Sequence, residues 1–137
     1  MAPPAGYSGT PLVRKLGIGE GDTVALIDEP DGFRPLLDPL PDAVTFRTDL
    51  RGRNEVVVAF FDRRSRFAAR LGPLGRTVFA AGSLWIAWPK KAAKVPTDMS
   101  EDVVREVALP TGLVDVKVCA IDDTWSGLKL VWRKELR

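Results

Sequence analysis

Acidic side chains and a proline follow the first strongly apolar run of the chain. The segment Asp28 to Gly32 comes directly after Val24 to Ile27 and holds three carboxylates, one proline and one glycine. A phosphate-bearing cofactor needs free backbone amides at a glycine-rich turn, so this segment disfavours NAD and ATP. A cationic sulfonium cofactor tolerates acids better, and Asp49, about 20 residues further on, could hold its ribose. Asp28 and Asp49 are therefore the candidate cofactor-binding residues. The alternative is that the acids only cap turns.

A second candidate site joins an indole to ammonium groups. Trp88 ends an apolar run and is followed by Pro89 and three lysines. Such a set could bind a small anionic ligand, or a nucleotide stacked on the indole. A packed tryptophan with solvated lysines is the alternative. The candidate ligand residues are Trp88, Lys90, Lys91 and Lys94.

A third candidate lies between two apolar segments near the end of the chain. The segment Asp122 to Gly127 has the Asp, Ser and Gly residues that a turn requires, and these do not explain Trp125. We expect Trp125 to lie over the core as a lid. Contact of Trp125 and Asp122 with a protein partner is the alternative.

The chain has no histidine and a single cysteine. Ser-His-Asp and Cys-His nucleophile pairs and His-ligated metal sites are therefore excluded, and no metal site is predicted. Cys119 sits in an alternating apolar segment, which is typical of a small buried residue. The segment from Gly6 to Gly9 precedes an expected helix and could bind an anion, although it lacks the preceding strand and the Lys-Ser/Thr of a phosphate loop, so capping by Ser8 or Thr10 is the preferred interpretation. No catalytic residue is assigned.

Apolar runs of strand length alternate with helical segments along the chain. Continuous runs of this kind indicate strands buried on both faces of a mostly parallel sheet. Val114 to Ile121 alternates instead and leads through a loop to Leu128 to Arg133, which predicts an antiparallel hairpin. The expected strands are 23–28, 44–48, 55–61, 83–88, 114–121 and 128–133.

Capping residues and helix breakers set the expected helices. Pro11 to Leu16 is expected to be helical and to end at Gly17, and Gly32 to Leu37 to form a short helix. Ser65 to Leu71 should end at Gly72-Pro73, with a further turn or two from Leu74 to Ala81. Ser100 is expected to cap a helix that ends at Pro110.

Length and composition suit one domain, residues 11–137, preceded by a flexible segment, residues 1–10. The net charge is +2, and the longest apolar run is far shorter than the ~20 residues of a membrane helix. We therefore expect a cytoplasmic protein that does not contact a membrane.

Two resemblances follow from these segments. Gly21 to Val24, Asn54 to Val58 and Gly82 to Ile86 resemble three sheet strands of class I methyltransferases, enzymes that also end in an antiparallel hairpin. This implies a three-layer, Rossmann-like (methyltransferase-like) α/β fold. Gly6 to Leu12, Trp88 to Lys91 and Asp115 to Lys129 are similar to an uncharacterised bacterial family of unknown function, which implies a small bacterial protein and no particular activity.

Three functions compete at this point. The first hypothesis is a non-catalytic Rossmann-like binding or interaction module without a cofactor, because the loop from Asp28 to Gly32 lacks the glycine-rich sequence that usually holds a cofactor. The second is an S-adenosylmethionine-dependent, methyltransferase-like enzyme that uses Asp28 and Asp49. The third is nucleic-acid binding through the arginine-rich helix and Lys90 to Lys94, although the low net charge argues against nucleic acid as a partner.

Overall fold

A computed structural model describes residues 9–137. Most of the segment that we expect to be flexible, and the proposed Ser8 cap, lie outside the described residues. The core of the protein is one six-stranded sheet of order β2-β1-β3-β4-β6-β5. The strands are β1 (Thr23–Ile27), β2 (Thr45–Arg47), β3 (Val56–Phe60), β4 (Ser83–Pro89), β5 (Leu113–Ala120) and β6 (Trp125–Trp132). The helices are α1 (Leu12–Lys15), α2 (Arg64–Val78) and α3 (Glu101–Ala108), with short 3₁₀ turns η1 (Arg34–Leu37), η2 (Lys91–Ala93), η3 (Leu109–Thr111) and η4 (Lys134–Leu136).

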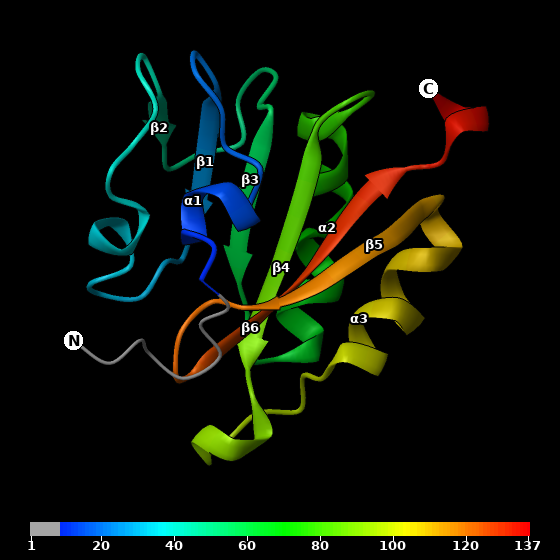
Figure 1. Cartoon of the computed structure of the whole chain (residues 1–137). Helices are drawn as coiled ribbons and strands as arrows, with labels where there is room; N and C mark the ends of the chain where they lie inside the picture. The colour runs from blue at the N-terminus through cyan, green and yellow to red at the C-terminus, as the bar shows by residue number, and fades with distance from the viewer. Residues whose placement is uncertain (1–8) are drawn as a thin grey trace.

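Strands β1 to β4 pair in parallel, whereas β6 pairs antiparallel with both β4 and β5. The mostly parallel sheet with an antiparallel hairpin at one end, predicted from the sequence, is therefore confirmed. Within the hairpin, β6 is the inner strand and β5 the edge strand (Figure 1).

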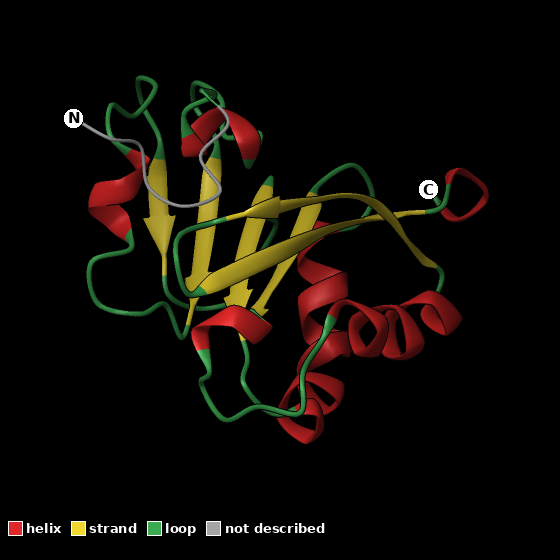
Figure 2. Ribbon diagram, turned by 60° about the horizontal axis from the view of Figure 1, so that its bottom comes forward, coloured by secondary structure: helices red, strands yellow, loops and turns green. Residues whose placement is uncertain are grey.

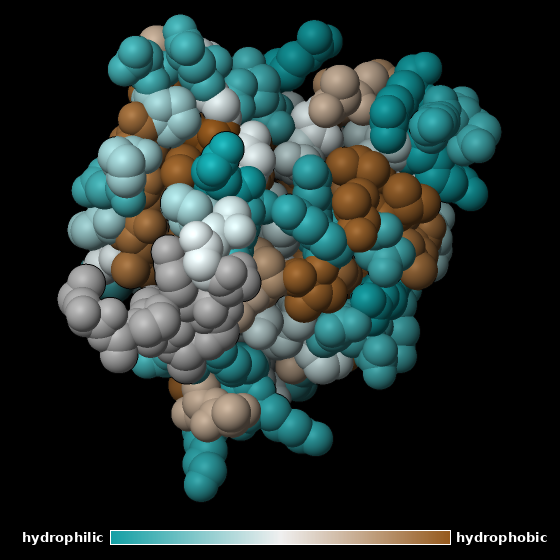
Figure 3. Space-filling view, viewed as in Figure 1, coloured by the Kyte–Doolittle hydropathy of each residue, from teal (hydrophilic) through white to brown (hydrophobic). Residues whose placement is uncertain are grey.

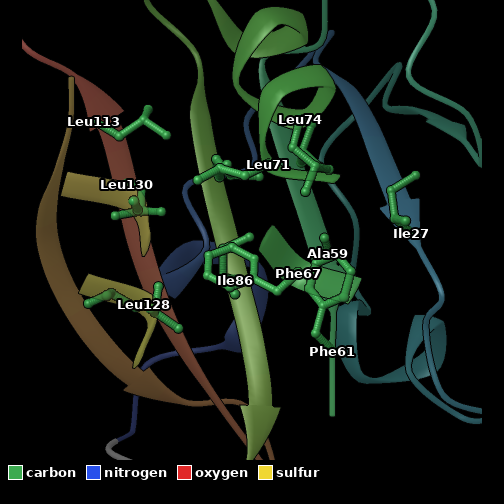
Figure 4. Packing of buried hydrophobic residues seen from close by; sticks show 14 of the residues in the cluster. Ile27, Ala59, Phe61, Phe67, Leu71, Leu74, Ile86, Leu113, Leu128 and Leu130 are labelled. Carbon is green, nitrogen blue, oxygen red and sulfur yellow. The ribbon is translucent and has the colours of Figure 1, made fainter. Parts of the chain in front are cut away.

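Two apolar clusters lie on opposite faces of the sheet. On one face, α2 and α3 pack on alternate residues of the strands, and Figure 2 shows these two helices together on that side. Figure 4 shows Phe67, Leu71 and Leu74 of α2 directed at the strands near Ala59 and Ile86. On the other face, α1 and η1 cover β1 and β3. Because both faces of β3 and β4 are covered, every residue of these strands is buried, as their unbroken apolar sequences predict.

Helix α2 differs from the expectation because it runs without a break through Pro73. A proline inside a helix costs about 3 kcal/mol. Phe67, Leu71, Leu74 and Val78 form a single stripe buried in the core across that position, so their burial outweighs the cost. Gly72 reduces the cost further, since it has no Cβ to clash with the proline ring.

Helix α1 and strand β5 also differ in detail. The residue at the N-cap of α1 is Pro11, and no side chain caps the helix, so Thr10 does not have the expected role. A bulge between Asp115 and Lys117 interrupts the pairing of β5. The alternation predicted over Val114 to Ala120 is therefore wrong, because side chains beyond a bulge change face.

Within residues 9–137, no helix combines the length and the apolar character that spanning a bilayer requires.

Candidate functional site

The order of the strands places a reversal point between β1 and β3. From β1 the chain adds β2 on one side, and it then returns to add β3 and β4 on the other. Loops after neighbouring parallel strands diverge at such a point, and open α/β sheets bind ligands there, beyond the carboxyl ends of the strands. The loops that follow β1 and β3 form this rim, which Figure 1 shows at the lower end of these two strands.

A cavity of about 180 Å³ opens at this reversal point. Phe60 and Trp125 form its aromatic wall in an edge-on contact with ring centroids 5.1 Å apart, and Phe33 packs edge-on against Phe60 at 5.0 Å without lining the cavity. The lining residues are Asp28, Phe60, Phe61, Asp62, Arg66 and Trp125. The cavity therefore combines aromatic surface with two carboxylates and a guanidinium.

Asp28 is held at the cavity by two arginines of α2. Its carboxylate lies 3.5 Å from Arg66 and 3.8 Å from Arg70, and its backbone has a φ of 57°. The α2 arginine Arg64 pairs with Glu106 at 2.9 Å. Three arginines proposed for nucleic acid thus have acidic partners within the chain, which weakens the third hypothesis.

Asp49 follows β2, the parallel neighbour of β1, and the last paired residue of β2, Arg47, lies opposite Ala25. Its side chain is exposed, and one carboxylate oxygen accepts a hydrogen bond from the backbone N–H of Arg51 at 3.0 Å. The other carboxylate oxygen has no hydrogen bond to residues 9–137 and can accept one from a ligand hydroxyl.

The rim loop after β1 fits a nucleoside cofactor with a sulfonium in two respects. Gly32 has a φ of +82°, which glycine adopts most readily, and no atom lies within 4 Å of the position of a Cβ. A ligand could therefore approach the backbone there. Asp28 also lines the cavity beside Phe60 and Trp125. The cavity itself is smaller than the ~300–1,000 Å³ of a typical ligand pocket, so it encloses only part of such a molecule.

The structure separates the second candidate set. Trp88 is buried in the core cluster on the face that α2 and α3 cover. Lys90 donates its backbone N–H to Thr124 O at 2.8 Å, while Lys91 begins η2 and Lys94 ends it with a φ of 56°. This placement favours the packing alternative for Trp88.

The third candidate set joins the cavity. Asp122 accepts hydrogen bonds from the backbone N–H groups of Thr124 and Trp125, both at 2.8 Å, and so fixes the turn before β6. That turn holds Trp125 against Phe60. The sequence singled out Trp125 and Asp28, whereas Phe60 and Phe61 were missed, and Arg66 was expected only as part of the arginine-rich helix. Aromatic residues at the ends of buried runs were the only available signal.

No group of three or more acidic, cysteine or histidine side chains suited to a metal occurs in the described part of the chain.

Cys119 is half-buried on β5 beside the second apolar cluster. Burial raises the pKa of its thiol, and Lys15 and Lys117 offset the rise only in part. A raised pKa leaves less thiolate at neutral pH, and thiolate is the reactive form.

We expect iodoacetamide to modify the folded protein more slowly than the urea-unfolded chain at pH 7.5, with the rate rising toward alkaline pH. Mass spectrometry of the alkylated protein measures both rates. Equal rates in the two states would contradict this account.

Several solved structures with a similar arrangement of strands and helices are methyltransferases. N-methyltransferase NodS from Bradyrhizobium japonicum WM9 is 11% identical, with a TM-score of 0.59 over 89% of this chain and 93% of that one. A SAM-dependent methyltransferase from Aquifex aeolicus is 15% identical, with a TM-score of 0.61 over 87% of this chain and 86% of that one. Magnesium protoporphyrin IX methyltransferase from Synechocystis PCC 6803 is 11% identical, with a TM-score of 0.57 over 89% and 74%.

At these identities the likeness shows the fold, a methyltransferase-like Rossmann arrangement. No protein-family model matches the sequence, so the resemblance to an uncharacterised bacterial family stays a prediction. A search of curated proteins also finds no match. The structural likenesses contradict our first hypothesis, the non-catalytic binding or interaction module, and favour the methyltransferase-like alternative.

Proposed function

We propose that this protein is a methyltransferase-like enzyme that binds S-adenosylmethionine at the rim beyond β1 and β3. The observation that carries the proposal is the arrangement at the reversal point. There, Asp28 after β1 lines an aromatic-walled cavity, and Asp49 follows the neighbouring parallel strand β2. Ligands of open α/β sheets bind at this place.

Each residue of the rim has a task in this proposal. Asp49 accepts hydrogen bonds from the ribose hydroxyls, as an acid after the second strand does in dinucleotide sites. Asp28 attracts the ammonium of the cofactor's amino-acid part. Arg66 and Arg70, which pair with Asp28, attract the carboxylate of that same part of the cofactor. Gly32 leaves the loop backbone open to close approach.

When bound, S-adenosylmethionine supplies a methyl group on a sulfonium that a nucleophile can accept. Phe60 and Trp125 place apolar surface beside this position and keep water from it. Asp62 lines the same cavity and is its candidate proton acceptor, because the chain has no histidine.

Replacement of Asp49 by asparagine should weaken binding of S-adenosylhomocysteine, the demethylated product. Removal of a charged hydrogen-bond acceptor costs about 1.5–3 kcal/mol, which corresponds to roughly 10–100-fold in Kd. Isothermal titration calorimetry measures the change, and the product should also raise the Tm of the unmodified protein.

Asp42→Asn is the matched control, because Asp42 precedes β2 and lies at the opposite end of that strand. We expect its Kd to remain within about threefold of the unmodified protein, as for a neutral surface change. Absence of both heat and a Tm shift at millimolar product would refute the proposed cofactor. An equal loss of affinity in the two variants would refute only the role of Asp49 and not the binding of the cofactor.

A further inference from the structure

On the face of the sheet that carries α1, the last two strands lack a helical layer among residues 9–137. Figure 1 shows α1 in front of β1 and β3, and α2 and α3 pack on the opposite face. Figure 3, in the same view, shows hydrophobic residues gathered over β5 and β6. A sheet face with apolar residues is usually covered by another layer, so this one is open to a partner.

Four residues define this surface, which we call the β5–β6 face: Val114, Lys117, Lys129 and Val131. Val114 and Val131 are directly opposite each other in the ladder, and both are partly exposed. Val116, at the bulge beside them, is 53% exposed. A partner that covers the valines would remove this apolar area from water.

The lysines of the β5–β6 face form an unfavourable pair within the chain. Lys117 lies directly opposite Lys129, and like charges at opposed positions of a ladder destabilise it. Asp115 is nearby in sequence, but it accepts a hydrogen bond from Arg105 of α3 at 2.9 Å on the other face. Carboxylates from a partner would compensate the two lysines.

A groove next to this face extends its positive charge. About 420 Å³ of space lies between α1 and β5, and its lining includes Arg14, Lys15 and Lys117. The groove lies along β5 beyond Lys117, so its basic groups continue the lysine pair on the side away from the valines. This arrangement of an apolar pair beside a basic row suits a ligand with one apolar and one acidic stripe.

We propose that the β5–β6 face binds an acidic amphipathic helix of a protein partner. The helix would take the place on this face that α3 has on the other, with apolar residues on Val114 and Val131 and carboxylates toward Lys117 and Lys129. A second copy of the chain fits less well, because it would bring the same lysines together. This interaction is independent of the proposed cofactor, whose residues lie at the carboxyl ends of the parallel strands.

A displayed library of random peptides about 16 residues long, enough for roughly four helical turns, tests the proposal. Selection on the immobilised full chain should enrich acidic peptides with apolar residues at helical spacing. Lys117→Glu should weaken binding of the enriched peptides at least ~10-fold. Its effect on the Tm should be small, because the opposed pair with Lys129 becomes attractive while the contact of the Lys117 ammonium with the Trp85 ring, 5.9 Å from its centroid, is lost. Arg63→Glu makes the same charge change on α2's N-cap and should bind the peptides normally.

Several outcomes would overturn the proposal. They are enrichment of peptides without acidic residues, absence of any enrichment, or equal binding by the Lys117→Glu variant. A dimer in light scattering that dissociates on Val131→Asn would assign the face to a second copy instead. Retention of RNA or DNA at low salt that is lost with Lys117→Glu would assign it to nucleic acid.

Discussion

Trp85→Ala should lower the free energy of unfolding by about 3–5 kcal/mol, the range for large aromatic residues in cores. Trp85 is fully buried in the middle of β4. Its indole Nε1 donates a hydrogen bond to Leu16 O at 3.0 Å, and Leu16 lies at the end of α1. The substitution removes both the packing of the ring and the link from the sheet to α1. Urea unfolding followed by circular dichroism measures the loss, which is large beside a total stability of about 5–15 kcal/mol.

Trp85→Phe separates the two contributions. It retains much of the apolar volume but leaves the carbonyl of Leu16 without its donor, so we expect a smaller loss of about 1–3 kcal/mol. A Trp85→Ala protein within 1 kcal/mol of the unmodified chain would show that Trp85 does not hold α1 on the sheet.

The strands were predictable because their sequences report burial on two faces. Val56 to Phe60 contains no polar residue, and such a run suits only a covered, central strand. Pro73 and the bulge of β5 were not predictable in the same way. Local rules break a helix at proline, and only the buried stripe across α2 shows that tertiary packing outweighs the rule.

The candidate site was predictable in its acids and not in its wall. Asp28 and Asp49 each follow a strand, so their place beyond the carboxyl ends of the strands follows from a parallel sheet. Phe33, Phe60 and Trp125 come from three distant segments, and their convergence depends on the return of β6 beside β4. The ion pairs of Asp28 with α2 depend equally on tertiary packing. A sequence pattern carries no direct signal of contacts at such separations.

The structural likeness to methyltransferases does not depend on a glycine-rich first loop. The order of the strands and the hairpin produce the likeness, and the loop after β1 differs without altering either. A fold can host many functions, so the activity has to be tested at the rim. Such a test changes the acidic residues after the strands and the aromatic residues of the cavity.

Gly82→Ala should also destabilise the protein strongly. Gly82 immediately precedes β4, and a Cβ there would lie 2.8 Å from Asn54 O, 2.9 Å from Val78 O and 3.1 Å from Glu55 O. These atoms belong to the backbone, and two of them accept hydrogen bonds at the start of β4, Val78 O from Gly82 itself and Glu55 O from Ser83. The neighbours cannot rotate away, so we expect a loss of about 3 kcal/mol, the upper end of the usual cost of overpacking. The free energy of unfolding in urea measures it.

Gly19→Ala is the control for the extra methyl group alone. The nearest atom to a Cβ at Gly19 is the carboxylate oxygen of Asp22 at 3.7 Å, an ordinary contact with a flexible side chain. We therefore expect the Gly19→Ala protein to remain within about 1 kcal/mol of the unmodified chain. If both variants unfold alike, the close approach of three carbonyl oxygens at Gly82 does not determine how β4 enters the sheet. If only Gly82→Ala is unstable, the junction between α2 and β4 sets the position of the strand, and β4 in turn orders β6 and Trp125 at the cavity.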